Sequence, residues 1–209
     1  MIELHNADCL EAMRLMEDDS FELAIVDPPY GIGMHGGKRG SFAIDKGQKT
    51  KHEKKNWDNA IPIPEYFKEL MRVSQNQIIW GGNYFLDYLG ATRCFCVWDK
   101  MNGTNNLSDC ELAWTSFDSS VRMFRHHHFS GGGEVRYHPT QKPVALYTWL
   151  LEKYAKKGYR ILDTHLGSGS IAIAAHNLGY DLTGYELDKD YYQAAQERLQ
   201  QHQQQLRMF

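Results

Sequence analysis

A short acidic and aromatic motif follows the apolar run Leu23-Ala-Ile-Val26. It consists of Asp27, Pro28, Pro29 and Tyr30. Because proline lacks an N–H and fixes φ, the motif can neither continue a strand ladder nor begin a helix directly. It therefore holds a carboxylate, a backbone carbonyl and an aromatic ring close together. Two acceptors beside a ring can bind a planar amine; the alternative, in which Asp27 merely caps a helix, is disfavoured by the second proline.

A second motif combines glycines with small polar residues. The segment Asp163-Thr-His-Leu-Gly-Ser-Gly-Ser170 joins an apolar run to a small-residue helical pattern. Gly167 and Gly169 predict a turn whose backbone can approach a ligand beside a helix start. Glu186 ends the next apolar run, near the offset of about 20 residues at which an acid meets ribose hydroxyls. Since the third glycine of a dinucleotide site is absent, a nucleoside without pyrophosphate fits better than NAD.

Alternating apolar runs and helical patterns must position these motifs. Short continuous apolar runs suit strands that are buried on both faces of a parallel sheet. The predicted strands are Leu23–Val26, Gln77–Trp80 and Arg160–Asp163, and the predicted helices are Pro64–Arg72, Val144–Lys156, Ser170–Leu178 and Asp188–Gln205. This alternation predicts an α/β fold with a doubly wound, mostly parallel sheet.

Length and composition are those of an ordinary globular chain. The 209 residues are 42% hydrophobic and 23% charged, which excludes disorder and a coiled-coil rod. We expect one domain over residues 1–209, with a basic insertion at 31–61 and a second excursion at 116–137. No apolar run is long enough to span a bilayer, and the first residues lack the pattern of a secretory signal. These features predict a soluble, cytoplasmic protein with no membrane partner.

Basic residues are concentrated in two segments, although the net charge is −3. Residues 34–55 contain seven Lys and Arg against two acidic residues, and residues 122–142 contain four against one. Such segments on an acidic body suit contacts to nucleic-acid phosphates, although solvated loops would have the same charge. The candidate DNA-binding residues are Lys38, Arg39, Lys46, Lys49, Lys51, Arg122, Arg125, His126, His128 and Arg136.

Histidines and cysteines do not form a convincing metal site. His126, His127 and His128, if on a strand, would point to alternating faces, so no more than two could share an ion. Cys94 and Cys96 are expected on one face of a strand as buried small residues, and no disulfide framework is expected. We predict no metal. Asp109 and Glu111 are interpreted as polar residues at a strand edge, which leaves Asp27 as the only carboxylate of its cluster.

Several motifs together resemble the DNA amino-methyltransferases that use S-adenosylmethionine. Asp27–Tyr30 matches the catalytic motif of that family, and 163–170 matches its cofactor loop. The segments 6–10, 80–85, 110–114 and 138–143 are also similar to family segments. The catalytic motif comes first and the cofactor loop last, which is the order of the β class. The resemblance implies a Rossmann-like methyltransferase fold with a circularly permuted motif order.

The resemblance also implies roles for individual residues. The catalytic residues would be Asp27, Pro28, Pro29 and Tyr30. The residues binding S-adenosylmethionine would be Asp8, Cys9, Asp27, His138, Thr140, Lys142, Asp163, His165, Gly167, Ser168, Gly169, Ser170 and Glu186. In two places the sequence departs from the family pattern: His165 stands where an aromatic residue is usual, and the target-recognition segment at 116–137 is short.

The implied activity is methylation of the N6 amine of a flipped adenine in DNA, in the setting of restriction–modification. Adenine is preferred because aspartate, rather than serine, begins the catalytic motif; N4 of cytosine is the alternative. Two rivals of other classes are an NAD-dependent oxidoreductase and a non-catalytic DNA-binding module. RNA stays open as a substrate, because basic segments do not distinguish it from DNA. Many β-class relatives self-associate, so a homodimer is a family-level expectation.

Overall fold

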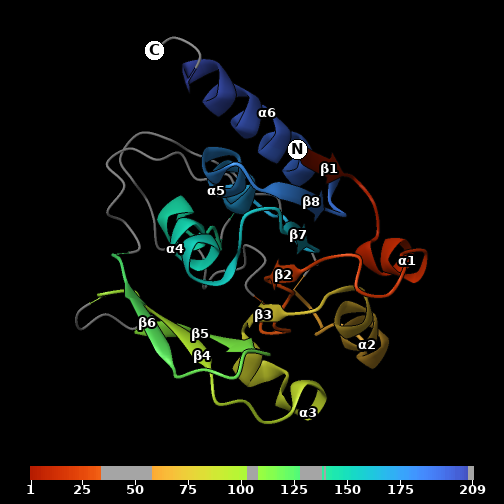
Figure 1. The fold of residues 1–209 in the computed structure, drawn as a ribbon, viewed down its shortest axis with the longest axis vertical. Helices are drawn as coiled ribbons and strands as arrows, with labels where there is room; N and C mark the ends of the chain where they lie inside the picture. Colours follow the sequence, from red (N-terminus) through yellow and green to blue (C-terminus); the bar gives the residue numbers. More distant parts are fainter. Residues whose placement is uncertain (34–57, 103–107, 128–137, 139, 207–209) are drawn as a thin grey trace.

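The computed structural model describes residues 1–33, 58–102, 108–127, 138 and 140–206. Its centre is an eight-stranded sheet in the order β1-β8-β7-β2-β3-β5-β4-β6 (Figure 1). In chain order the strands are β1 (Ile2–His5), β2 (Leu23–Val26), β3 (Gln77–Trp80), β4 (Phe95–Asp99), β5 (Cys110–Thr115), β6 (Arg122–Arg125), β7 (Arg160–Asp163) and β8 (Asp181–Tyr185).

Helices cover both faces of the sheet. They are α1 (Cys9–Arg14), α2 (Pro64–Val73), the 3₁₀ turn η1 (Gly82–Tyr84), α3 (Leu86–Leu89), α4 (Val144–Tyr154), α5 (Ser170–Leu178) and α6 (Lys189–Leu206). Helices α4, α5 and α6 pack against one face, and α1, α2 and α3 against the other (Figure 1). Each face has its own apolar core, so the sheet is the middle layer of three.

Strand β2 shows why the central strands are continuously apolar. Leu23 and Ile25 point into the core that α4, α5 and α6 cover, whereas Ala24 and Val26 point into the opposite core. All four are buried, because successive side chains of a strand alternate between faces and both faces are covered. The predicted boundaries of β2, β3 and β7 are confirmed to the residue.

The direction of the strands determines where functional side chains can meet. Strands β1, β8, β7, β2 and β3 pair in parallel, while β5 runs antiparallel to both β3 and β4. The chain proceeds from β7 to β8 on one side and from β2 to β3 on the other. The neighbouring strands β2 and β7 therefore form a topological switch point, outside whose carboxyl ends ligands bind in such sheets. The predicted doubly wound, mostly parallel fold is confirmed.

The helix predictions agree with the structure to within two residues. Asp188 caps α6, since its Oδ1 accepts hydrogen bonds from the N–H groups of Asp190 and Tyr191. Cys94 and Cys96 are both buried, and both sulfur atoms contact the hydroxyl of Tyr154, as expected for one face.

The segments without a regular pattern are described only in part. Of the insertion at 31–61, residues 34–57 lie outside the described residues, as do 128–137 of the excursion at 116–137. The described part of that excursion contains strand β6, which ends at Arg125. The interpretation that places the histidines on a strand is therefore wrong for His126 and His127, which follow it. No helix in the described ranges is long and apolar enough to cross a membrane.

Candidate active site

Two adjoining cavities open at the carboxyl ends of the parallel strands. The larger, here called the large cleft, has a volume of about 700 Å³ and follows the ends of β1, β7 and β8. The smaller, here called the small pocket, has about 310 Å³ and lies at the ends of β2, β3 and β4. Asp27, Pro29, Thr140 and Lys142 line both cavities. The two predicted motifs therefore meet at one composite site, with Gly167 in the cleft and Tyr30 in the pocket.

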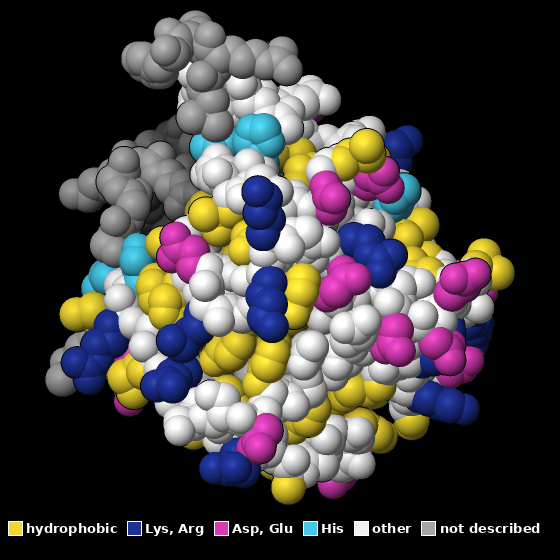
Figure 2. Space-filling model, in the orientation of Figure 1, with side chains coloured by type: hydrophobic (Ala, Val, Ile, Leu, Met, Phe, Trp, Pro, Cys, Tyr) yellow, Lys and Arg dark blue, Asp and Glu magenta, His cyan; other side chains and the backbone are white. Residues whose placement is uncertain are grey.

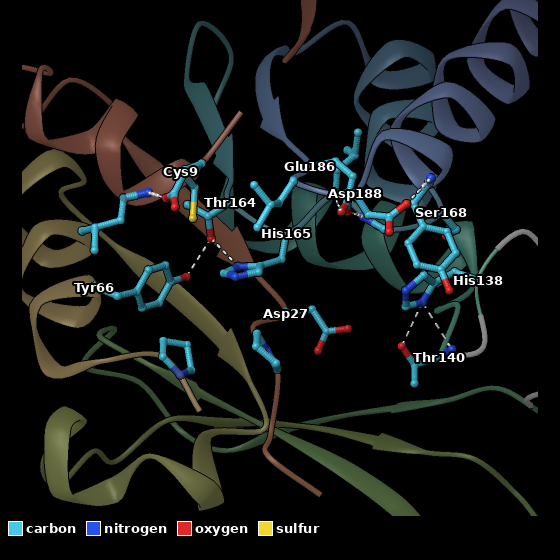
Figure 3. Close-up of a pocket in the computed structure, with 18 of the residues that line it drawn as sticks. Cys9, Asp27, Tyr66, His138, Thr140, Thr164, His165, Ser168, Glu186 and Asp188 are labelled. Carbon is cyan, nitrogen blue, oxygen red and sulfur yellow. Dashed lines mark hydrogen bonds between the residues drawn. The ribbon is translucent and has the colours of Figure 1, made fainter. Parts of the chain in front are cut away.

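The motif after β2 places a carboxylate between the two cavities. Oδ1 of Asp27 accepts a hydrogen bond from the hydroxyl of Tyr30 at 2.6 Å. Figure 3 shows the Asp27 carboxylate in the open centre of the large cleft, between the His165 side and the Thr140 side. Pro28 and Tyr30 line only the small pocket. The four predicted catalytic residues thus lie together. Asp27, the one charged residue among them, lines both cavities.

The ring of Tyr30 is held by the turn after β3. Its ring stacks on that of Tyr84, with centroids 5.0 Å apart. Gly81 has φ +69°, and a Cβ there would lie 2.2 Å from Cε1 of Tyr30. A Cβ on Gly82 would lie 2.4 Å from Cβ of Trp114. These contacts require two glycines, because a side chain at Gly81 would displace the ring of Tyr30 and one at Gly82 would collide with the Cβ and backbone of Trp114.

Backbone hydrogen bonds fix the glycine turn after β7. Glu186 accepts hydrogen bonds from the N–H of Gly167 at 2.8 Å and from the N–H of Asp188 at 2.9 Å. Asp163 accepts one from the N–H of His165 at 3.0 Å. Burial raises the pKa of Asp163 to about 8, against the opposing effect of this hydrogen bond. Asp163 is 2% exposed and lies beneath the cleft instead of lining it.

His165 presents a neutral ring to the cleft. Burial lowers its pKa to about 4, so the imidazole is uncharged at neutral pH. The ring meets Tyr66 edge to face, with centroids 5.4 Å apart, and its Nδ1 bonds the hydroxyl of Thr164 at 2.9 Å. Tyr66 in turn bonds Thr164 at 2.6 Å (Figure 3). A buried neutral imidazole supported in this way can take the packing role of an aromatic ring.

The end of the glycine turn is fixed from behind by α6. The buried Arg198 donates to the carbonyl of Ser168 and to Oγ of Ser170, both at 2.9 Å. A Cβ on Gly169 would lie 3.1 Å from Cβ of Ala195. Gly169 and Ser170 thus pack against α6 and do not line the cleft. Their positions therefore do not favour the direct cofactor contact that we expected for both. Arg198 has no motif around it that would reveal this role in the sequence.

Asp8, Cys9, His138 and Thr140 line the remaining walls of the large cleft. Asp8 caps α1 by accepting from the N–H of Leu10 at 2.8 Å. Nδ1 of His138 bonds the hydroxyl of Thr140 at 3.1 Å. Burial, and then the charge of Asp8, raise the pKa of Cys9 to about 12. Cys9 is therefore a neutral thiol and not a nucleophile.

A network of charges around the buried Lys142 lies at the boundary of the two cavities. The Lys142 ammonium forms an ion pair with Oδ2 of Asp27 and lies 3.1 Å from Oε2 of Glu111. Lys100 contacts the other oxygen of Glu111 at 2.6 Å. Asp27 is therefore not the only carboxylate of its cluster. Interpreting Glu111 as a strand-edge residue is wrong, because β5 lies between β3 and β4.

The pKa values follow from burial and from these pairs. Burial lowers the pKa of Lys142, but the charges of Asp27 and Glu111 outweigh it and raise the value above its usual range. Burial raises the pKa of Glu111, and the charges of Lys142 and Lys100 then bring it down to about 2. The pKa of Asp27 is raised by burial, against the opposing charge of Lys142. Asp27 is thus the carboxylate of the cluster that binds a proton more readily.

The candidate DNA-binding residues that the structure describes line neither cavity. Arg122 and Arg125 are exposed on the edge strand β6, and Arg125 pairs with Asp99 at 3.3 Å. His126 follows them and stacks on Phe124. Figure 2 shows Lys and Arg side chains near β6 at the lower left, whereas acidic side chains gather over α1 and α2 at the right. Outside the described residues lie Lys38, Arg39, Lys46, Lys49, Lys51, His128 and Arg136.

Comparisons with known proteins agree with this fold. Over most of its length the chain is similar to a Type II methyltransferase, M.HpaI of Haemophilus parainfluenzae, with 23% identity over 92% of this chain and 72% of the relative. The crystal structure of an M1.HpyAVI–SAM complex matches with a TM-score of 0.62 and 20% identity, covering 95% of this chain and 100% of that one. The cytosine-N4-specific PvuII DNA methyltransferase matches with a TM-score of 0.61 and 11% identity, covering 96% and 90%.

The family comparison extends over more than half of the chain. The model of the N6/N4 methyltransferases, described as DNA methylase, matches residues 79–197. This stretch begins in β3 and includes the glycine turn, Glu186 and, of the charge network, Lys100, Glu111 and Lys142, whereas Asp27 precedes it. The chain therefore belongs to the family of N6/N4 DNA methylases, the S-adenosylmethionine-dependent DNA amino-methyltransferases.

Proposed function

We propose that the protein transfers a methyl group from S-adenosylmethionine to the N6 amine of an adenine flipped out of DNA. One observation carries this proposal: the Asp27 carboxylate lies where a cleft of about 700 Å³ adjoins a pocket of about 310 Å³. A donor molecule in the first and a single base in the second would both reach this carboxylate. Binding energy can then be used to align donor and acceptor for a direct transfer.

The large cleft fits a charged nucleoside. Its volume lies within the range of about 300–1,000 Å³ that is usual for small-molecule sites. The Glu186 carboxylate is aligned by two backbone N–H groups and suits ribose hydroxyls. Asp8, the neutral His165 and Tyr66 offer polar and aromatic surface, and Thr140 lies on the opposite wall. When bound there, S-adenosylmethionine supplies an electrophilic methyl group.

The small pocket fits a single base. Flipping the base out of the duplex costs a few kcal/mol, and stacking on an aromatic side chain returns about 1–3 kcal/mol. In this pocket the exocyclic amine donates to the Asp27 carboxylate and to the carbonyl of Pro28. These bonds favour a tetrahedral nitrogen whose lone pair is free to attack. The protein thus contributes positioning and electrostatic stabilisation.

Asp27 also accounts for the proton that the amine must lose. As the N–C bond forms, the bond from the methyl carbon to the sulfonium sulfur would break and leave a neutral thioether, and the nitrogen would be positively charged with one proton in excess. Burial raises the pKa of Asp27, so its carboxylate can accept this proton and pass it to water. An amine aligned on Asp27 needs no protein nucleophile, so we propose direct transfer without a covalent enzyme intermediate. The Cys9 thiol in the large cleft is protonated, which agrees with this.

N4 of cytosine is the second candidate acceptor. It is favoured by the similarity to the cytosine-N4-specific PvuII structure, whereas the aspartate that begins the motif favours adenine. Both bases carry an amine conjugated to a ring, and both fit a pocket of about 310 Å³. We retain adenine as the proposal and cytosine as the alternative.

The acceptor base can be identified directly. The protein is incubated with labelled S-adenosylmethionine and enzymatically amplified, unmethylated genomic DNA, and the DNA is then digested to nucleosides. We expect the label in N6-methyl-2′-deoxyadenosine. Label in N4-methylcytosine would overturn the base assignment and keep the reaction. Label only in RNA added in parallel would overturn the substrate class, and no label in either nucleic acid would overturn the proposed function.

We further propose that the two basic excursions, 31–61 and 116–137, contact the DNA backbone around the flipped base. Among the residues that the structure describes, this proposal is supported by Arg122 and Arg125, which are both exposed on the edge strand β6. Replacing both with alanine is expected to reduce the slope of log affinity against log salt concentration by about one to two. An unchanged slope would remove β6 from the interface.

A further inference from the structure

Lys142 occupies the acceptor that the proposed function assigns to the target amine. Its side chain is 3% exposed, and its ammonium is paired with Oδ2 of Asp27. It also lies 3.3 Å from the hydroxyl of Tyr30 and 5.4 Å from the ring centre of Trp80. A protonated amine thus lies against the carboxylate beside the ring on which the base would stack. This ammonium and a target amine would compete for the same oxygen.

Glu111 offers the lysine a second carboxylate. Its Oε2 lies 3.1 Å from Nζ of Lys142 and, apart from this ion-pair contact, has no hydrogen-bond partner among the described residues. Its other oxygen is bonded to Lys100 at 2.6 Å, which holds the carboxylate in place. Lys142 can therefore leave Asp27 and keep a counter-charge without leaving the protein interior. Without that second partner, a buried ammonium would stay on Asp27, because an unpaired buried charge is costly.

We propose that Lys142 stands in for the target amine on Asp27, and that Glu111 is the positioning residue that retains the lysine when the base arrives. This inference rests on the proposed function of Asp27 as the acceptor of the amine. No covalent step is added: one N–H donor on Asp27 is exchanged for another, and the displaced ammonium bonds Oε2 of Glu111. The exchange keeps the aspartate paired both before and after the base enters.

The exchange also determines the charge of Asp27. Burial and the neighbouring Glu111 both favour the neutral acid, whereas Lys142 favours the carboxylate. The titratable groups that influence this cluster come from six parts of the fold: Asp27 and Tyr30 after β2, Lys100 after β4, Glu111 on β5, Lys142 before α4, Tyr147 on α4 and Asp163 on β7. Lys142 thus keeps Asp27 ionised until an amine replaces it.

The test is a double-mutant cycle of Glu111→Gln and Lys142→Met. Methyl transfer from labelled S-adenosylmethionine to unmethylated amplified genomic DNA gives the apparent kcat, and calorimetry gives the dissociation constant of S-adenosylmethionine. We expect E111Q to lower kcat about tenfold in the wild-type background, because the lysine then holds Asp27 more firmly. In the K142M background the same change should have no further effect, since there is no lysine to retain. An equal effect in both backgrounds would overturn the inference.

The pH profile provides a second readout that a purely structural role would not move. K142M should shift the acidic limb of kcat/KM for DNA to higher pH, because Asp27 loses its counter-charge. E111Q should shift this limb to lower pH, because Asp27 loses a neighbouring negative charge. The K142M profile does not depend on the folding of E111Q. An acidic limb in K142M that coincides with the wild type would therefore overturn the inference by itself.

Glu22→Gln is the matched control. The side chains of Glu22 and Glu111 are equally exposed, at 22%, and both pair with a basic residue, but Glu22 lies before β2 and pairs with Arg160. We expect it to leave kcat and the pH profile unchanged. Wild-type protein that methylates no nucleic acid would overturn the proposed function and this inference together. Wild-type transfer with an unaffected E111Q would overturn this inference alone.

Discussion

The two cavities of the site are stabilised in different ways. Glu186 in the large cleft and Asp163 beneath it are each held by N–H groups of neighbouring turns, so their positions follow from local backbone geometry. In the small pocket, Asp27 is paired with Lys142, which also contacts Glu111. The backbone hydrogen bonds join each carboxylate to fixed N–H groups, whereas the Lys142 ammonium has two carboxylate partners within reach. The comparison indicates a fixed binding cleft beside a reacting pocket that can rearrange.

The largest effect is expected for Asp27→Ala, which should impair methyl transfer in the small pocket and leave S-adenosylmethionine binding in the large cleft nearly unchanged. Asp27→Ala removes the acceptor that aligns the amine, and we expect kcat to fall about 10³-fold. The dissociation constant of S-adenosylmethionine should change by less than about threefold, because the turn after β7 does not depend on Asp27. Single-turnover methylation and calorimetry measure the two quantities. A variant with near-normal turnover would remove Asp27 from the mechanism.

Gly81→Ala tests whether the ring of Tyr30 must keep its place. The added Cβ would lie 2.2 Å from that ring, so we expect kcat to fall about 10²-fold with S-adenosylmethionine binding retained. Gly179→Ala is the matched control, because Gly179 has a similar positive φ and nothing within 4 Å of the added Cβ. The control should cost only the backbone strain, about 1 kcal/mol in the free energy of unfolding. Equal loss of kcat in the two variants would show that strain, and not Tyr30, is responsible.

Glu186→Gln is the counterpart in the large cleft. Gln keeps the shape but loses the charge that accepts two backbone N–H bonds, so we expect the dissociation constant of S-adenosylmethionine to rise about tenfold. At saturating S-adenosylmethionine, kcat should stay within about threefold of the wild type. The proposed division between the cavities would fail if kcat fell and affinity did not.

The smallest expected effect concerns stability and its dependence on pH. Because the pKa of Asp163 in the folded protein is about 8, above its value in an unfolded chain, its contribution to stability is complete below pH of about 4 and is lost as the pH rises through 8. Asp163→Asn removes this loss while keeping an acceptor for the N–H of His165. Thermal unfolding should show a midpoint about 3–6 °C higher than wild type at pH 8 and little change at pH 4. An equal shift at both pH values would indicate that Asp163 stays ionised.

What the sequence predicts well depends on local patterns. The strand limits of β2, β3 and β7 follow from short apolar runs between turn residues, and the motif after β2 follows from its prolines. The turn at Gly167 follows β7, and Glu186 follows the adjacent parallel strand β8. Their proximity is therefore a consequence of one βαβ unit. These local patterns therefore predict several residues of the large cleft and the part of the small pocket that Asp27–Tyr30 forms.

What the sequence does not predict depends on contacts between distant segments. Glu111 enters the site because β5 is antiparallel, which brings its first residues to the same edge of the sheet as the ends of β3 and β4. No spacing rule connects Glu111 to Lys142 or Arg198 to Ser168. Gly169 and Ser170 fit a ligand-binding pattern, yet α6 packs behind them and determines their role.

The pairing of β2 with β7 has a consequence for how such a site can be encoded. Asp27 ends the one strand and the glycine turn follows the other, and they meet because these strands are adjacent, although most of the chain lies between them. The chemistry depends on this lateral contact and not on which half the ribosome makes first. A gene in which the two halves have exchanged places, with suitable connections, would encode the same reaction centre.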